Sequence, residues 1–197
     1  EDNDILKAVP FPRIAGGKPF DVNGTEMTVD FANDEGTKKF TENWDRLIKE
    51  DLINTQISGW SDAWFQGFGN GTLASVVTGA WMPGNLIANS PEGEGNWRVA
   101  PIPTYDGTPA NAENGGSSMA ALKGSKNPDL AAAFVDWLNH DQESIDIFLA
   151  SGGFPSTVAD MEDTKFTGAD MPYFGDQKVN EVLVAGAKDV LPGWQYL

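Results

Sequence analysis

The sequence contains no cysteine among its 197 residues and only one histidine. The lack of cysteine excludes a disulfide framework, a thiolate nucleophile and a cysteine-ligated metal site. No apolar run approaches the roughly 20 residues that a membrane-spanning helix needs. The first residues, Glu1 to Asp4, do not resemble a signal peptide, so we expect any export signal to lie upstream of this sequence.

Basic residues are also scarce. The chain has 13 lysines and arginines against 29 aspartates and glutamates, which gives a formal net charge of −16. A field of this sign repels nucleic acid and anionic lipid surfaces, so we expect no nucleic-acid partner. The content of 40% hydrophobic and 11% aromatic residues is that of a globular protein rather than a disordered one.

Motifs for catalysis, metals and cofactors are missing as well. His140 is the single histidine and lies in the polar sequence Asn139-His140-Asp141, which favours a solvated helix end over a catalytic triad. Neither a phosphate-binding glycine loop nor a calcium loop is present. We predict no catalytic residue, no metal and no cofactor. A carboxylate pair suited to glycoside hydrolysis stays open as an alternative, because acidic residues are abundant.

The periodicity of apolar residues predicts several helices. In the first of them, Phe40, Trp44, Leu47 and Ile48 recur on one face. Another is expected where Asn127 precedes Pro128, a strong helix start. The expected helices begin near Asn33 or Asp34, after Ser61, after Asn127, near Asp141 and around Val179.

Between the helices, short apolar runs predict strands. We expect a short strand over residues 25–29, a strand of small residues that runs into Trp81, and strands over 97–102 and 119–122, with a loop after Pro83 and Gly84. Strands that alternate with helices indicate an α/β architecture.

Trp81 is the most informative single residue. It stands at the end of the expected strand of small residues and shortly before the chain-breaking Pro83 and Gly84. An aromatic side chain in such a place often faces a cleft, where its flat ring can stack on a sugar. The alternative is that Trp81 fills the core.

Five blocks in a fixed order resemble the extracellular solute-binding proteins of bacterial ABC importers, in particular the carbohydrate-binding branch (family 1 type). The blocks are Gly79-Ala80-Trp81, Val99-Ala-Pro-Ile-Pro103, Gly115-Gly-Ser117, Ser125-Lys-Asn-Pro128 and Gly152-Gly-Phe-Pro155. Each block is weak alone, and the ordered set is specific. The resemblance covers residues 36–197.

The resemblance implies an α/β, periplasmic-binding-protein-like fold of type II, in which two lobes trap a ligand between them. The chain resembles the C-terminal half of such a polypeptide. It would therefore hold the C-terminal lobe plus a returning segment of the N-terminal lobe. Residues 1–111 would form the first part of the C-terminal lobe, 112–150 would cross to the N-terminal lobe, and 151–197 would close the C-terminal lobe. Another segment would supply the missing part of the N-terminal lobe.

The family pattern also indicates ligand-binding residues. Trp81 would stack on a sugar ring, and Gly115, Gly116 and Ser117 would offer backbone N–H groups and a hydroxyl. The alternative for this Gly-Gly-Ser block is a plain turn. The remaining candidates are Asn114, Trp60, Trp64, Phe154 and Trp194, and of these Trp64 fits the core better than the ligand site.

From this resemblance we expect a non-catalytic protein that binds a carbohydrate, an oligosaccharide in particular, and delivers it to the permease subunits of an ABC importer. It would be extracellular, either membrane-tethered as a lipoprotein or periplasmic. Two alternatives stay open. One is a secreted carbohydrate-active enzyme, and the other is a protein-binding sensor domain on the same fold.

Overall fold

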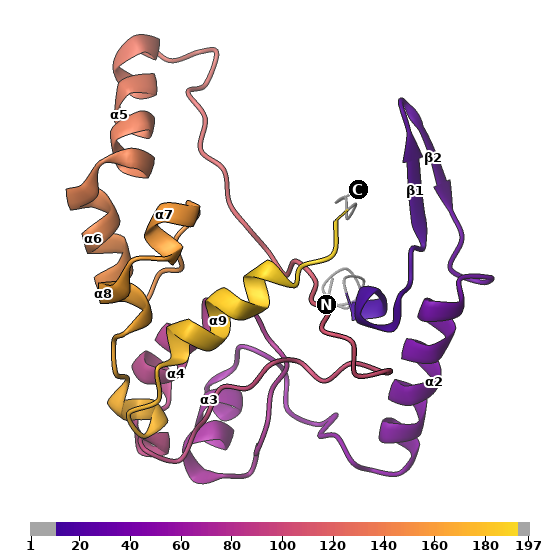
Figure 1. The fold of residues 1–197 in the computed structure, drawn as a ribbon. Coiled ribbons are helices and arrows are strands. Elements are labelled where there is room, and N and C mark those ends of the chain that lie inside the picture. Colours follow the sequence, from indigo (N-terminus) through magenta and orange to yellow (C-terminus); the bar gives the residue numbers. More distant parts are fainter. Residues whose placement is uncertain (1–10, 193–197) are drawn as a thin grey trace.

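The computed structural model describes residues 11–192, which form a mainly helical structure with one small sheet (Figure 1). Its elements, in chain order, are η1 (Phe11–Ala15), β1 (Phe20–Asn23), β2 (Glu26–Val29), α2 (Glu35–Lys49), α3 (Asp62–Asn70), α4 (Met82–Asn89), η2 (Pro91–Gly93), α5 (Pro128–His140), α6 (Gln142–Ala150), α7 (Val158–Met161), α8 (Thr164–Thr167), η3 (Pro172–Phe174) and α9 (Val179–Lys188).

The helix starts that the sequence predicts are confirmed. Asp34 caps α2 and Ser61 caps α3, each by accepting a hydrogen bond from a backbone N–H in the first turn. Asp141 does the same for α6. Asn127 and Pro128 stand at the start of α5, and α9 begins at Val179, as expected. The short helices α7 and α8 were not expected, because four residues are too few to show an apolar period.

The predicted strands are wrong except for the first. Within residues 11–192 the one sheet is the antiparallel pair of β1 and β2, with Phe20 opposite Val29. Residues 74–79, 97–104 and 112–122 form no strand, although they run without helix or turn over most of their length. A strand needs the N–H and C=O groups of a neighbouring strand, and the described part of the chain does not place one beside these segments.

A side chain replaces a strand partner at one of these places. The backbone N–H of Val99 donates to the Gln177 Oε1 atom at 2.8 Å, and Gln177 Nε2 donates to the Val99 carbonyl at 2.7 Å. The Gln177 amide therefore pairs with Val99 as a neighbouring strand would. This contact holds the segment from Trp97 onward against the C-terminal part of the chain.

The loop expected after Trp81 is also wrong, because α4 begins there. Pro83 lies in the first turn of α4, a position that tolerates proline since the first N–H groups of a helix have no helical acceptor. Read as a chain breaker, the same proline suggests a loop. The helix is favoured because it buries Met82 and Leu86, which lie on one face of α4, in the core.

The core lies where α3, α4, η3 and α9 meet. Its buried members are Phe68, Met82, Leu86, Tyr173, Phe174 and Val179. Ser90 is also fully buried, and its hydroxyl donates to the Phe65 carbonyl at 2.7 Å. The Tyr173 hydroxyl donates to the Ser90 carbonyl at 2.7 Å. Burial raises the pKa of Tyr173, and Glu92 and Glu94 add to this effect, so the phenol stays protonated as a donor.

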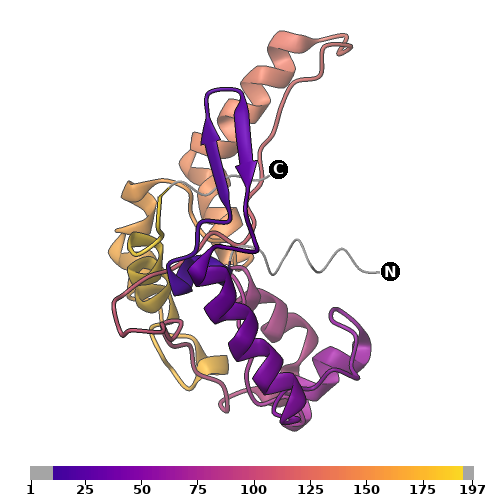
Figure 2. The ribbon, with the colours of Figure 1, turned by 90° about the vertical axis from the view of Figure 1, so that its right-hand side faces the viewer.

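Two parts project away from this core. Figure 1 shows the α5–α6 pair on one side and the β1–β2 hairpin on the other, and Figure 2 shows that both rise in the same direction. Helix α5 has no buried residue, and α6 has only Ser144. We call residues 117–150, which comprise an extended segment, α5 and α6, the arm.

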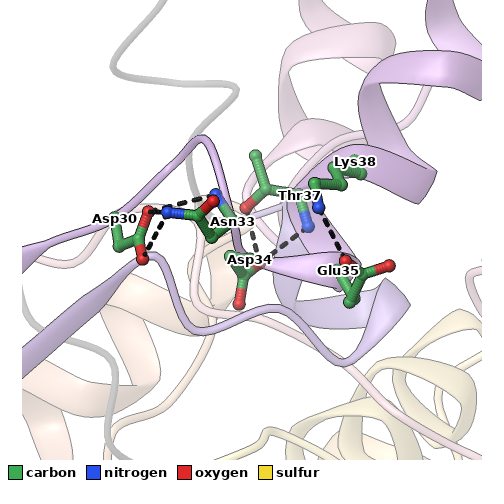
Figure 3. A network of polar contacts seen from close by, with 6 residues as sticks. All are labelled: Asp30, Asn33, Asp34, Glu35, Thr37 and Lys38. Atoms are coloured by element: carbon green, nitrogen blue, oxygen red, sulfur yellow. Dashed lines mark hydrogen bonds and ion pairs between the residues drawn. The ribbon is translucent and has the colours of Figure 1, made fainter.

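A network of polar contacts fixes the start of α2 (Figure 3). The Asp34 carboxylate accepts hydrogen bonds from the Thr37 N–H at 2.7 Å, the Thr37 hydroxyl at 2.7 Å and the Lys18 N–H at 2.8 Å. Burial alone would raise the pKa of Asp34, but these hydrogen bonds and the charge of Arg13 outweigh it and lower the pKa. The ionised form of Asp34 is therefore the one that stabilises the fold.

We expect Asp34→Ala to lower the free energy of unfolding by about 1 kcal/mol at neutral pH, the usual value of an N-cap. Because the pKa is lower in the folded state, the stabilisation is complete above the unfolded pKa of about 4 and is lost as the pH falls through the folded pKa. Urea unfolding at several pH values tests this. Asp34→Asn is the control, since it keeps a capping oxygen without a titrating group. An Asp34→Ala protein as stable as wild type at pH 7 would contradict the prediction.

Candidate functional site

Trp81 stands directly before α4, and several contacts fix it there. Its side chain is 36% exposed. The indole Nε1 atom donates to the Asn114 carbonyl at 3.1 Å, and the Asn85 amide donates to the Trp81 carbonyl at 2.9 Å. Since Met82 is 1% exposed, the backbone that carries Trp81 is anchored in the core. The indole is thus held in one orientation while part of its surface faces solvent.

A continuous series of aromatic rings leads from Trp81 to the core. The Trp60 ring lies 5.4 Å from that of Trp81, with 32° between the planes. Trp60 also lies 5.4 Å from Trp64, which in turn contacts Phe68 edge-to-face at 4.6 Å. We call Trp60, Trp64, Phe68 and Trp81 the aromatic cluster. Phe68 is 2% exposed, so the cluster is buried at one end and exposed at the other.

Trp60 has an unusual backbone conformation. Its φ is +64°, in the left-handed region that a bulky residue seldom adopts, and its side chain is 49% exposed. This conformation costs on the order of 1–3 kcal/mol. Ring contacts with Trp64, Phe65 and Trp81 offset the cost. The same contacts hold the Trp60 indole beside that of Trp81.

The predicted Gly-Gly-Ser block lies next to Trp81. A Cβ atom added to Gly115 would stand 3.7 Å from the Trp81 Nε1 atom. Gly115 and Gly116 have φ values of +103° and +132°, which side-chain-bearing residues rarely adopt, and Gly115, Gly116 and Ser117 are exposed. Asn114, a predicted ligand-binding residue, contacts the Trp81 indole through its backbone carbonyl.

The structure therefore brings together Trp81, Trp60, Trp64, Asn114 and Gly115. Trp64 is half-buried against the core, as its helical spacing suggested. Phe154 is also half-buried, and its ring packs edge-to-face on Phe166 at 5.9 Å. Trp194 lies outside the described residues.

Two residues of this site carry little signal in the sequence. Gly79 permits the indole to fold back on the chain, because a Cβ there would lie 2.5 Å from Trp81 Nε1. The Gly79-Ala80-Trp81 block was the one hint of this contact. The Asn85 amide had no such hint, since asparagine near the start of a helix occurs for many reasons.

His140 lies on the arm and pairs with Asp136 of the same helix at 2.9 Å, with both side chains exposed. Within residues 11–192, no group of three or more histidines, cysteines or carboxylates could hold a metal ion. The same residues include no helix long and apolar enough to cross a membrane. What the site offers is a partly exposed indole beside a glycine-rich backbone, an arrangement suited to binding.

Comparison with known proteins identifies the family. The family model for bacterial extracellular solute-binding proteins matches residues 8–143, more than half of the chain. The chain belongs to this family. The aromatic cluster and the Gly115–Ser117 block are thus features of a solute-binding protein, and the resemblance noted from the sequence is confirmed.

One solved structure matches over the whole chain. It is the ABC transporter associated binding protein from B. animalis subsp. lactis Bl-04 in complex with β-1,6-galactobiose. The sequences are 40% identical, the TM-score is 0.89, and the match covers 100% of this chain and 50% of that one. The solute-binding chain described here therefore spans about half the length of this relative.

A second solved structure, an extracellular solute-binding protein of family 1, is 23% identical with a TM-score of 0.53. The match covers 78% of this chain and 39% of that one, and at this identity it supports the fold alone. No curated protein matches the chain. The predicted fold class, an α/β periplasmic-binding-protein-like fold of type II, is confirmed by these relatives, and residues 11–192 hold part of that fold.

Proposed function

We propose that this solute-binding protein binds a carbohydrate, specifically an oligosaccharide, outside the membrane and delivers it to an ABC importer. The observation that carries the proposal is the Trp81 indole, partly exposed and fixed by its hydrogen bond to Asn114. A rigid aromatic surface of this kind suits the apolar C–H face of a pyranose ring. The relative that binds β-1,6-galactobiose supports the same ligand class.

In this proposal the aromatic and glycine-rich parts have different roles. Trp81 supplies apolar contact at little cost in entropy, because its orientation is already fixed. Gly116 and Ser117, both exposed and next in the chain after Gly115, would supply an N–H group and a hydroxyl for sugar hydroxyls. The protein would carry out no reaction on the sugar, and its partners would be the permease subunits. The family supports an extracellular location, and tethering to the membrane is part of the proposal.

We also propose that the chain contributes to two lobes, with residues 112–150 crossing from one lobe to the other and back at residue 151. The support is an uncovered apolar surface on the arm. Its members include Leu130 (69% exposed), Phe134 (56%), Ile147 (62%) and Phe148 (52%). Met119, Ala120 and Ala121 line an open groove of about 500 Å³ together with Ala132 and Val135 of α5, and the polar Asp136, Asn139, His140 and Ser156 complete its lining. Further strands of the solute-binding fold would cover this surface.

Calorimetric titration of the complete protein tests the function. We expect β-1,6-galactobiose or a longer β-linked galactoside to bind at one site per molecule. Galactose alone should bind more weakly, because it offers fewer polar contacts. A panel of glucose- and mannose-based disaccharides serves as the control for specificity. Absence of heat with every sugar of the panel would contradict the proposal.

A second experiment tests the absence of catalysis. Oligosaccharides incubated with the protein should be recovered intact after prolonged incubation, since we propose that the protein binds its ligand without reacting with it. Analysis of the products by chromatography provides the measurement. Cleavage that scales with protein concentration would favour a carbohydrate-active enzyme instead.

A further inference from the structure

We propose that Trp60 is an internal competitor for the stacking surface of Trp81, so that a bound sugar takes the place of the Trp60 ring. The two indoles lie 5.4 Å apart with 32° between their planes, which is an offset stack rather than an edge-to-face contact. The sequence suggested Trp60 as a ligand-binding residue, whereas in this proposal it opposes the ligand. The inference rests on the proposed function, because the ligand in question is the sugar that Trp81 would bind.

The space between the two indoles is too narrow for a sugar. Carbon atoms in contact lie about 3.5–4 Å apart, so a sugar ring held between two aromatic rings needs about 7–8 Å between the ring centroids. The observed distance is 5.4 Å. Trp60 and Trp81 therefore do not clamp a sugar between them in this arrangement. The part of Trp81 that Trp60 covers becomes available to a ligand only when Trp60 leaves.

The backbone at Gly79 takes up a further part of the Trp81 indole. A Cβ atom added to Gly79 would lie 2.5 Å from Nε1, 2.9 Å from Cε2 and 3.1 Å from Cδ1 of Trp81. Such similar distances to three neighbouring ring atoms place this backbone over the ring rather than beyond its edge. Gly79 is held in place, because its carbonyl accepts the N–H of Met82 at 3.0 Å and Met82 is 1% exposed. Of these two groups, Trp60 is the one that can leave.

The backbone conformation at Trp60 favours its release. Trp60 is the third residue of a four-residue turn from Ser58 to Ser61, in which the Ser61 N–H donates to the Ser58 carbonyl at 3.4 Å. The φ angle is +64° at Trp60 but not positive at Gly59, which is typical of a type II turn with glycine in the third position. Reversal of the peptide between Gly59 and Trp60 gives a type I turn, in which φ at Trp60 is negative. This change releases the ring while Ser61 stays at its place as the cap of α3.

Two opposing effects on the stacked ring are similar in size. The left-handed conformation of a bulky residue disfavours the stacked state by a factor of roughly 5–150. Each ring contact, with Trp64, Phe65 and Trp81, favours it by a factor of roughly 2–12. The stacked state is therefore only weakly preferred. A sugar that binds Trp81 in the released state shifts the population toward that state.

Calorimetric titration of the complete protein with β-1,6-galactobiose tests the role of Trp60 by the sign of the effect. Trp60→Gly removes the ring and suits the positive φ. We expect its affinity for the sugar to rise by about 2- to 10-fold, which corresponds to one ring contact. Removal of a residue that binds the sugar would lower the affinity instead. An affinity equal to or lower than that of wild type therefore overturns the competition.

Asp51→Gly is the matched control for the backbone. Asp51 has a φ of +55° and is exposed, so the substitution relieves similar strain without removing an indole. We expect the affinity of Asp51→Gly to equal that of wild type, and a rise as large as that of Trp60→Gly would overturn the role of the ring. Trp60→Gly is also combined with Trp81→Ala. The double variant should bind no more tightly than Trp81→Ala, because no stacking surface is left to compete for. The same gain in both backgrounds would contradict the proposal.

Fluorine NMR of the complete protein labelled with fluorotryptophan follows Trp60 directly, since its resonance is the one missing from Trp60→Gly. Without sugar, we expect this resonance to be broadened by exchange between the stacked and the released ring. In Trp81→Ala it should be sharp and at a different position, and saturating sugar should move the wild-type resonance toward that position. Sugar binding that leaves the resonance unchanged overturns the displacement. If calorimetry shows no binding, the proposed function fails for this ligand, whereas a sharp resonance without sugar would by itself overturn the weak preference for the stacked state.

Discussion

Trp81→Ala in the complete protein is expected to weaken sugar binding by about 5- to 150-fold. A stacked aromatic side chain contributes on the order of 1–3 kcal/mol, and each 1.4 kcal/mol changes the dissociation constant tenfold. The substitution also removes the N–H group that donates to the Asn114 carbonyl, so the glycine-rich segment beside it loses its fixed position. Calorimetric titration with β-1,6-galactobiose measures the change in affinity.

Trp44→Ala is the matched control for this experiment. Trp44 is a half-buried tryptophan on α2, where its ring contacts Phe40 at 5.8 Å. Figure 1 shows α2 well separated from α4. Both substitutions remove an indole and should lower the stability, but only Trp81→Ala should lower the affinity. Equal affinities for wild type and Trp81→Ala would remove Trp81 from the binding site.

Phe68→Ala should lower the free energy of unfolding by about 3–5 kcal/mol, the range for large aromatic side chains in a core. Phe68 is 2% exposed and contacts Trp64 at 4.6 Å and Trp97 at 5.5 Å, in both cases edge-to-face. The cavity left behind would be lined by these indoles. They cannot collapse into it easily, because the Trp97 Nε1 atom donates to the Phe68 carbonyl at 3.3 Å. Urea unfolding followed by circular dichroism measures the loss.

Phe31→Ala provides the comparison, since Phe31 is 42% exposed and packs edge-to-face on Phe20 at 5.1 Å. We expect Phe31→Ala to lower the free energy of unfolding by well under half as much as Phe68→Ala. The reason is that folding buries only part of the apolar surface of Phe31. A similar loss for both variants would mean that the core does not lie around Phe68. Sugar affinity should also fall in Phe68→Ala, because the aromatic cluster rests on this ring.

Much of the helical structure could be predicted from local sequence. Asp34, Ser61 and Asp141 cap helices because their side chains bind N–H groups only a few residues away. The apolar stripe of α2 and the proline at the start of α5 act over equally short distances. Both partners of such an interaction lie within a few residues of each other in the sequence, so the interaction can be predicted without knowledge of the rest of the fold.

The strands could not be predicted in the same way. Apolar runs such as residues 119–122 have strand composition, but a strand exists only where another strand pairs with it. Within the described residues, Val99 finds its partner in the Gln177 side chain, 78 positions away. Pro83 shows the same limit for α4. A proline can either interrupt a helix or stand in its first turn. Which of the two occurs at Pro83 depends on whether Met82 is buried in the core.

For the site, the sequence singled out Trp81 and the Gly115–Ser117 block, and the structure places Trp81 next to Gly115. The sequence did not reveal that the Asn114 backbone carbonyl accepts a hydrogen bond from the indole. Every residue has a backbone carbonyl, so the residue type does not indicate which one is used. The left-handed conformation of Trp60 was equally hidden. Phe154, expected at the ligand site from its loop motif, packs on Phe166 in the structure.

By itself, the sequence indicated the family and the starts of α2, α3, α5, α6 and α9, because these depend on residue types and short spacings. Only the tertiary structure decided which segments meet. Trp81 and Asn114 are 33 positions apart, and Gly84 and Gly152 are separated by an even longer stretch of chain. Such contacts arise when the core around Phe68 and Met82 fixes α4 and both connections to the arm pack against it. Packing of this kind is a property of the whole fold, and no single motif encodes it.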